Sequence, residues 1–169
     1  MSEHIESTEL SFLMNNIRKA TEADIPRIIE ILRGTYLGTM AAIVPAKALE
    51  AFHAEDSAGE FARKCWQDFH VILSGEAIAG LLFVVGNTIE SLHIHPEFAK
   101  QGYGGKLLSL GERLIAEDHD HAELDVLEGN RNARDFYKSH GWNDVRVFSG
   151  MEVGDVPASM VLMSKAMTK

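Results

Sequence analysis

The stretch HIHPEFAKQGYGGKLL, from His93 to Leu108, joins an extended segment to a helical one through a turn with three glycines. Residues 88–96 read as a strand that ends at Pro96, because proline cannot extend the ladder of a central strand. After Gly105 the apolar period becomes helical, with Leu107, Leu108, Gly111, Leu114 and Ile115 on one face. A fold that contains this junction must pack a sheet against a helix.

The glycine turn has the composition of an anion site. The first N–H groups of a helix have no intrahelical acceptor, and the helix dipole favours negative charge there. Glycine lets an anion approach the backbone and permits positive φ. The P-loop pattern fails because Lys100 stands where its first glycine belongs, and Leu107 follows Gly105 and Lys106. The dinucleotide fingerprint fails because Leu107 also occupies the place of its third glycine.

The remaining sequence alternates between helical and extended patterns. We predict a strand at 17–21, a helix at 22–34 that stops at Gly34, and a helical region at 45–64 with a break near 57–59. Strands at 69–74 and 77–86 form a hairpin, and the strand at 88–96 precedes the helix from 105. A strand at 122–128, a helix at 131–141 and strands near 145–149 and 159–166 complete a mixed α/β fold with helices on both faces of the sheet.

The charge balance and the apolar pattern argue against nucleic-acid and membrane partners. The 16 Lys and Arg residues against 25 Asp and Glu give a net charge of −9, so we expect no nucleic-acid partner, which would need basic surface. No apolar run approaches the ~20 residues of a membrane span, and the N-terminus lacks the regions of a secretory signal. We therefore expect a cytoplasmic protein without a membrane partner, with residues 1–16 as a tail or arm and 17–169 as a single domain.

A second motif lies at residues 128–142, EGNRNARDFYKSHGW. Its Asn130, Ala133, Phe136, Tyr137, Gly141 and Trp142, together with the glycine turn, resemble the GNAT superfamily of acetyl-CoA-dependent N-acetyltransferases. The glycine turn looks like the family's pyrophosphate loop, and the second motif looks like its Asn-x-x-Ala-x-x-Phe-Tyr-x-x-x-Gly-Phe/Trp segment. One helix and one strand separate the two motifs, as in the family. The element order matches from about Ile17 to Met167.

The resemblance implies a fold and a reaction. The fold is a GNAT-like mixed, mostly antiparallel sheet flanked by helices on both faces. The reaction is direct transfer of an acetyl group from acetyl-CoA to a primary amine of a small molecule or peptide, and it needs no metal. The protein is compatible with a homodimer. A non-catalytic acyl-CoA-binding regulatory module of the same fold is the alternative. One departure is Ala99, where the family commonly has Arg or Gln.

The resemblance also implies residues that bind the cofactor. Its pantetheine arm would pair with the backbone of Leu92, His93 and Ile94 as an added strand does. Its pyrophosphate would lie on the backbone amides of the loop, which are those of Lys100, Gln101, Gly102, Tyr103, Gly104, Gly105 and Lys106. Asn130 resembles the family's cofactor-contacting Asn and also suits a helix N-cap. Tyr137 would protonate the departing thiolate, because a phenol is protonated at neutral pH.

The base that accepts the proton of the amine has several candidates. Glu90 ranks first, although strict alternation would place it on the face of Leu92 and Ile94 unless it lines a cleft or a bulge redirects it. Asp125 ranks second, five residues before Asn130. His93, His95 and a chain of waters stay open.

Two further residue types suit structural roles better than chemical ones. Cys65 lies beside Trp66 in a helical pattern with no activating base nearby in the sequence, which favours a packed thiol. His119 and His121 have a spacing of two without further clustered ligands, which favours a solvated turn over a metal site.

Overall fold

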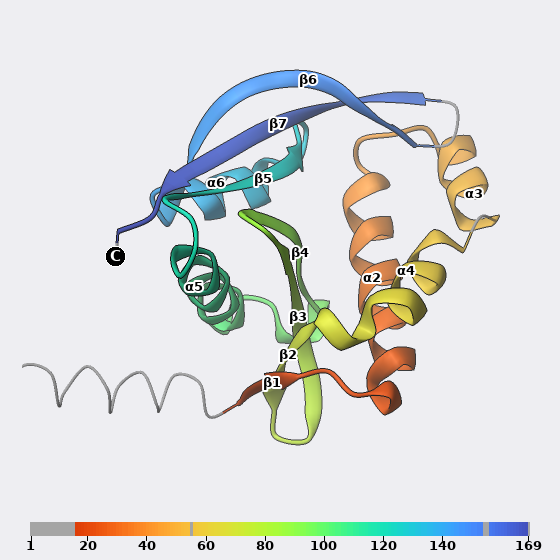
Figure 1. Ribbon diagram of the computed structural model, residues 1–169. Helices are drawn as coiled ribbons and strands as arrows, with labels where there is room; N and C mark the ends of the chain where they lie inside the picture. Colours follow the sequence, from red (N-terminus) through yellow and green to blue (C-terminus); the bar gives the residue numbers. More distant parts are fainter. Residues whose placement is uncertain (1–15, 55, 154–155, 169) are drawn as a thin grey trace, which may run out of the picture.

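A seven-stranded sheet forms the centre of the protein, in the order β1-β2-β3-β4-β5-β7-β6 (Figure 1). The computed structural model describes residues 16–54, 56–153 and 156–168. The strands are β1 Ile17–Lys19, β2 His70–Ser74, β3 Ala77–Val85, β4 Thr88–Ile94, β5 His121–Leu127, β6 Asn143–Val153 and β7 Val156–Ala166. Neighbouring strands pair antiparallel except β4 and β5, which are parallel.

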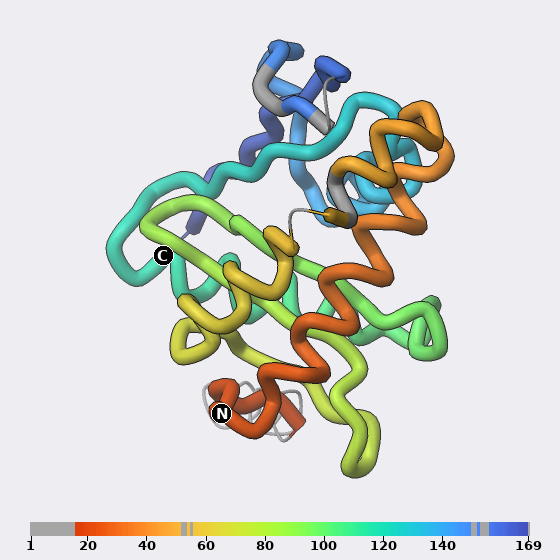
Figure 2. The backbone as a smooth tube through the Cα atoms, turned by 90° about the vertical axis from the view of Figure 1, so that its right-hand side faces the viewer, coloured from red at the N-terminus to blue at the C-terminus, as the bar shows by residue number. Residues whose placement is uncertain are grey.

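Helices cover both faces of this sheet, with α2 and α4 on one side and α5 and α6 on the other (Figure 1). The helices are α2 Ile25–Met40, α3 Ala46–Ala54, α4 Ser57–Cys65, α5 Tyr103–Ala116 and α6 Arg131–Ser139, with 3₁₀ turns η1 Glu22–Asp24, η2 Trp66–Asp68 and η3 Pro96–Phe98. Figure 2 shows α2 running across the strands of the first half of the sheet. The predicted mixed, mostly antiparallel sheet flanked by helices is confirmed.

Each helical layer has its own hydrophobic cluster. On the α5 side, Leu107, Leu108 and Ile115 are buried against residues of β3, β4, β5 and β7. On the α2 side, Ile28, Ile31 and Leu32 are buried against β2, β3 and α4. Burying a side chain of this size is worth roughly 1.5–3 kcal/mol, so these two clusters fix the helices onto the sheet.

Several predicted boundaries were wrong, and those of three helices bear on the site. Helix α2 does not stop at Gly34 but continues through Gly38 to Met40, which is 1% exposed. Each of these two glycines costs only about 1 kcal/mol inside a helix, and burial of Met40 helps to offset that cost. The break between α3 and α4 falls before Ser57, where Asp56 has a φ of 45°. Helix α5 begins at Tyr103 rather than at Gly105.

At the N-terminus, the structure describes the chain from Asn16 onward. The Asn16 side-chain amide donates to the Leu73 carbonyl of β2, and the Leu73 N–H donates to the Asn16 backbone carbonyl, both at 2.7 Å. Residues 1–15 lie outside the described residues, so the predicted arm and the single domain at 17–169 stay predictions. Within the described ranges, no helix has the length and the apolar character to cross a membrane.

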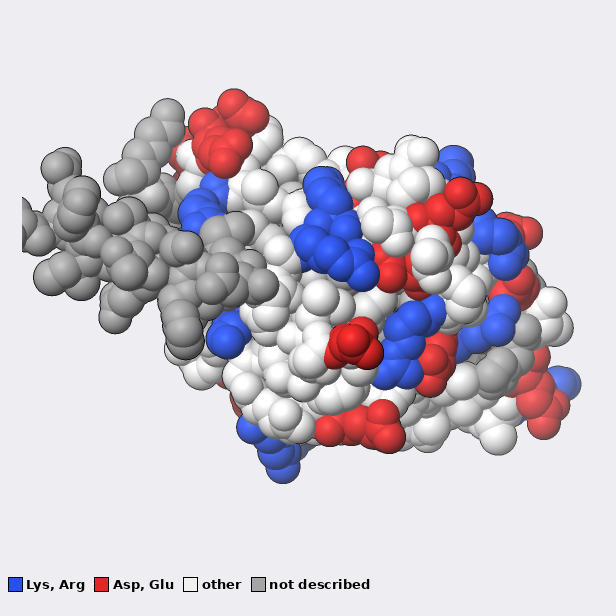
Figure 3. Space-filling model, turned by 90° about the horizontal axis from the view of Figure 1, so that it is seen from below, with Lys and Arg blue, Asp and Glu red and all other residues white. Residues whose placement is uncertain are grey.

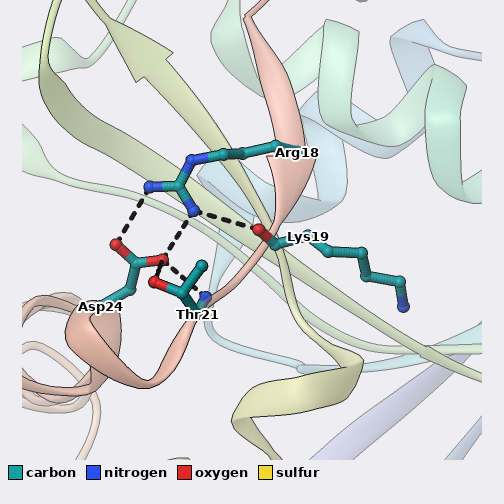
Figure 4. Close-up of polar contacts among 4 residues, drawn as sticks. All are labelled: Arg18, Lys19, Thr21 and Asp24. Atoms are coloured by element: carbon teal, nitrogen blue, oxygen red, sulfur yellow. Dashed lines mark hydrogen bonds and ion pairs between the residues drawn. The ribbon is translucent and has the colours of Figure 1, made fainter.

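Charges of both signs are interspersed on the face seen from below in Figure 3. One ion pair, between Arg18 of β1 and Asp24 of η1, also organises the start of α2 (Figure 4). Two Arg18 nitrogens donate to the two Asp24 oxygens at 2.6 and 3.0 Å. The Thr21 backbone N–H and hydroxyl also donate to Asp24, at 2.7 and 3.0 Å. These bonds, with that of Arg18 foremost, lower the pKa of Asp24 to about 2.

We expect Asp24→Asn to destabilise the protein by about 1–2 kcal/mol at pH 7, a value reduced for solvent screening of the half-exposed Arg18. Because the pKa of Asp24 is lower in the folded state, its contribution is complete above about pH 4 and is lost as the pH falls towards 2. Denaturant unfolding at pH 7 and pH 3 should show a smaller difference at pH 3. Glu22→Gln, at an exposed position in the same turn, is the control, and equal losses for the two variants would contradict this account.

Candidate active site

The candidate site lies where β4 and β5 part. The two strands share one ladder pair, Thr88 with Glu123, and the Glu123 N–H donates to the Asn87 carbonyl at 2.9 Å. Beyond this point the strands diverge (Figure 1), and a cavity of about 300 Å³ lies between them. Its walls come from α2, β4, β5, the loop before α6, α6 and β7. The lining residues are Thr35, Tyr36, Thr39, Met40, Ile89–Ile94, Leu124–Leu127, Asn130, Ala133, Tyr137 and Met160.

A β-bulge places Glu90 at this cavity. Phe83 of β3 pairs with Ser91 and Val84 pairs with Ile89, so Glu90 is the extra residue on β4. Strict alternation, which would put Glu90 on the face of Leu92 and Ile94, is therefore interrupted, and the bulge that we considered is present. Glu90 shares the cavity with Tyr36 of α2, and burial followed by the charge of the Glu90 carboxylate raises the pKa of Tyr36.

Asp125 lies on the opposite strand. Its neighbours Leu124 and Val126 are buried in the cluster under α5, whereas Asp125 is exposed on the other face of β5. Glu90 and Asp125 each follow the last β4–β5 pair by two residues, so the two carboxylates stand on the two diverging strands. Partial burial raises the pKa of Asp125, and the charge of Arg146 opposes that shift.

His93 faces α2 from β4. Its Nδ1 lies 2.9 Å from the Thr35 hydroxyl, and its ring lies 5.3 Å from that of Tyr36, centroid to centroid. Burial lowers the pKa of His93 to about 4. The imidazole is therefore neutral at pH 7.

Tyr137 of α6 is 8% exposed and packs against Trp142, with ring centroids 5.8 Å apart. It also lines the cavity. Burial raises the pKa of its phenol, so the hydroxyl keeps its proton at neutral pH and can donate it. Its neighbour Phe136 points elsewhere, towards Gly104 of α5 and His140.

Asn130 caps α6, as the sequence predicted. Its side-chain oxygen accepts a hydrogen bond from the Ala133 N–H at 3.2 Å. That bond does not use the side-chain NH₂ group, which is a donor, and Asn130 lines the cavity. The capping role and a ligand contact are therefore compatible. A second cavity of about 280 Å³ shares Asn130 and Thr39 with the first and lies between α2 and residues 129–132.

The glycine turn forms the N-terminus of α5. Lys100 and Gly102 have φ of 58° and 84°, and Gly102 is the N-cap. The Lys106 N–H donates to the Gly102 carbonyl at 3.3 Å, so the amides of Tyr103–Gly105 precede the first intrahelical bond. Leu92 and Ile94 pack towards this helix from β4, and Gln101 donates to the Glu97 carbonyl at 3.2 Å.

The glycines of the turn differ in their backbone conformation and in their surroundings. Gly102 has the positive φ that favours glycine, with open space around it. A Cβ on Gly104 would lie 3.4 Å from the Phe136 ring, and one on Gly105 would lie 3.4 Å from His140. Gly104 and Gly105 therefore face α6 and the His140 that follows it, at distances where a Cβ would make an ordinary van der Waals contact, a placement that the sequence did not predict.

Several cavity residues were not predicted. Thr35, Tyr36, Thr39 and Met40 come from α2, and Ser91 is a buried polar residue of β4. The spacing of Thr35 and Thr39, one helical turn apart, was a signal for a polar strip on an otherwise apolar face. His95, one of the open candidates for the base, is not among the lining residues and lies 3.7 Å from Glu30 and 3.5 Å from Glu97.

The sequence favoured structural roles for Cys65, His119 and His121. None of these residues lines the cavity. His121 instead lies 2.7 Å from Asp120 and 3.1 Å from Asn87. Among the residues that the structure describes, no three His, Cys, Asp or Glu side chains gather in a way that could hold a metal ion. The absence of a metal cofactor stays a prediction.

The sequence matches the model of the acetyltransferase (GNAT) family over residues 25–142. No curated protein sequence matches the chain. The fold is similar to that of many solved structures. One is a GCN5-related N-acetyltransferase from Rhodopseudomonas palustris, with a TM-score of 0.76, 19% identity, and coverage of 89% of this chain and 94% of that chain.

Two other similar structures carry more specific names. The PaiA N-acetyltransferase from Thermoplasma acidophilum, in complex with coenzyme A, has a TM-score of 0.68 and 20% identity, over 89% of this chain and 97% of that chain. The ribosomal-protein-S18-alanine N-acetyltransferase from Escherichia coli has a TM-score of 0.64 and 17% identity, over 90% of this chain and 94% of that chain. At these identities the structures show a shared fold.

Proposed function

This chain belongs to the acetyltransferase (GNAT) family and is an acyltransferase, and we propose that it moves an acetyl group from acetyl-CoA directly to a primary amine of a small molecule or peptide. The observation that carries this proposal is the cavity between β4 and β5, with Tyr137 and Glu90 on its walls. Acetyl-CoA would supply the activated thioester. The residues around the cavity supply the binding groups, a proton donor and a proton acceptor.

The residues present suit acetyl-CoA. The amides of Tyr103–Gly105, at the positive end of the α5 dipole, would hold the pyrophosphate. The backbone of Leu92–Ile94 pairs with β3 on one side and faces the cavity on the other, so it would pair with the amide groups of the pantetheine arm. The free NH₂ group of Asn130 adds a donor at the same wall. Lys100 and Lys106 flank the turn with positive charge.

Tyr137 is the proposed general acid. The carbon–sulfur bond breaks as the carbon–nitrogen bond forms, and the departing thiolate takes the phenolic proton of Tyr137. The buried phenol resists ionisation before the reaction, so its proton is present when the thiolate forms.

Glu90 is the proposed acceptor of the amine proton, ahead of Asp125. An alkyl ammonium with a pKa near 10 is mostly charged at pH 7 and must lose a proton before its nitrogen can attack. The described lining residues of the cavity include the carboxylates of Glu90 and Asp125 and no Lys or Arg. This arrangement attracts a cationic amine. The location in the cytoplasm, the absence of a nucleic-acid partner and the compatibility with a homodimer belong to the same proposal.

For the cofactor site, we expect Gly102→Asp to weaken coenzyme A binding at least tenfold, about 1.4 kcal/mol, relative to Gly102→Asn. Asp and Asn are the residues that best tolerate the φ of 84° and both cap helices, so they differ mainly in charge. The carboxylate would repel the pyrophosphate. Isothermal titration calorimetry measures the two affinities, and equal values would show that the phosphates bind elsewhere.

The general acid is tested with Tyr137→Phe, which removes one oxygen and keeps the ring. We expect wild-type protein to release thiol from acetyl-CoA with some members of an amine panel, and the variant to do so with a kcat about 100-fold lower and little change in cofactor affinity. Full turnover by the variant would mean that the thiolate needs no proton from Tyr137. Tight acetyl-CoA binding by the wild type without turnover on any amine would favour a binding module.

The two carboxylates give different expectations. Glu90→Gln keeps the size of the side chain but cannot accept a proton, so it should lower kcat/KM about 100-fold and alter the acidic limb of the pH–rate profile. Asp125→Asn, the matched change on the opposite strand, should have a much smaller effect. If Asp125→Asn is the damaging change, the ranking is wrong, and if both variants keep the wild-type profile, neither carboxylate is the base.

A further inference from the structure

The contact between Thr35 of α2 and His93 of β4 determines which ring nitrogen of His93 carries the proton. The Thr35 hydroxyl lies 2.8 Å from the Ile31 carbonyl and 3.3 Å from the Leu32 carbonyl. A carbonyl only accepts, so the single hydroxyl proton is directed to these oxygens. With its proton on the Ile31 carbonyl, the shorter of these two contacts, the hydroxyl oxygen acts as acceptor towards His93 Nδ1, 2.9 Å away. Nδ1 therefore carries the proton.

This assignment leaves Nε2 of His93 without a proton in the neutral ring. The two ring nitrogens point in different directions, so Nε2 is turned away from Thr35. Within the described part of the chain it has no hydrogen-bond partner, and His93 lines the cavity. Among the titratable residues of the cavity, Tyr36 of α2 lies with its ring 5.3 Å from that of His93, and Glu90, Asp125 and Tyr137 line the same cavity. An unprotonated nitrogen among them can only accept a hydrogen bond.

We propose that His93 presents Nε2 as a hydrogen-bond acceptor to the attacking amine, and that Thr35 is a positioning residue that keeps His93 in this tautomer. A primary amine has a second N–H to offer to Nε2 while Glu90 takes its proton. The two contacts together orient the nitrogen towards the thioester. The inference deepens the proposed acetyl transfer and rests on it, because it assigns recognition of the amine to the neutral side chain of His93 in addition to the carboxylate of Glu90.

The tautomer can be tested without any turnover. In ¹⁵N-labelled protein, Nδ1 of His93 should show the chemical shift of a protonated ring nitrogen and Nε2 that of an unprotonated one. The pattern should persist from pH 8 to pH 5, because burial lowers the pKa of His93 to about 4. Thr35→Val removes the acceptor for Nδ1 and should give a mixture of tautomers, whereas Thr35→Ser keeps the hydroxyl and should keep the wild-type pattern.

Kinetics test the contact with the amine. His93→Phe keeps a ring of similar size, and Thr35 keeps its bond to Ile31 in this variant. We expect His93→Phe to raise the KM for the amine about tenfold, as the loss of one hydrogen bond predicts, with the affinity for acetyl-CoA changed less than twofold. Thr35→Val should raise the KM for the amine several-fold and Thr35→Ser should restore it. His70→Phe is the control, because His70 of β2 also has a pKa lowered to about 4 but lies outside the cavity.

The outcomes separate this inference from the proposed function. If Nε2 carries the proton, or if His93→Phe keeps the wild-type KM for the amine, the inference is wrong while the acetyl transfer stands. If Thr35→Val and Thr35→Ser reduce the activity equally, Thr35 does not act through the tautomer. If no amine is acetylated by the wild type, the proposed function fails, and the inference fails with it even where the tautomer is as expected.

Discussion

The parting of β4 from β5 after a single ladder pair is the constraint on which the rest of the site depends. In the middle of a sheet, each strand normally bonds to neighbours on both sides. Here β4 keeps its ladder to β3 and β5 keeps its ladder to β7, while the backbone between them opens onto the cavity. The separated strands provide two walls that carry side chains and one backbone edge that can bind an extended molecule.

The hydrophobic cluster under α5 spans the opening between β4 and β5 and contains residues from both halves of the sheet. Leu107 and Leu108 pack with Leu82 of β3 on one side of the opening and with Leu124 of β5 on the other. A polar network adds to this connection, because Glu112 of α5 accepts from the Trp142 indole and from Lys165 of β7, both at 2.8 Å. The helix therefore joins the two halves of the sheet on either side of the cavity.

Burial has opposite effects on the pKa values of two cavity residues. It raises the pKa of Tyr137 and lowers that of His93, because burial disfavours the charged form of either group. Both side chains are therefore neutral near pH 7, one as a proton donor and the other as a hydrogen-bond acceptor. The negative charge at the cavity is left to Glu90 and Asp125. A single physical cause thus separates the groups that donate, accept and attract.

The sequence by itself determined the motifs and the order of the elements. The turn at 102–105 predicted a helix N-terminus and Asn130 predicted the cap of α6, and the two motifs together resembled the family whose model the chain matches. These features depend on local backbone preferences and on residues close together in the chain. They can therefore be read without knowing the packing.

Only the tertiary structure decided where the side chains of the site point. The carboxylate of Glu90 on an apolar face suggested a cleft or a bulge, but only the pairing of β4 with β3 shows that the bulge is present. The bond between Thr35 and His93 joins residues 58 positions apart, and Gly104 of α5 faces the Phe136 ring of another helix. Each of these depends on the register and packing of elements distant in sequence, which local preference and periodicity do not encode.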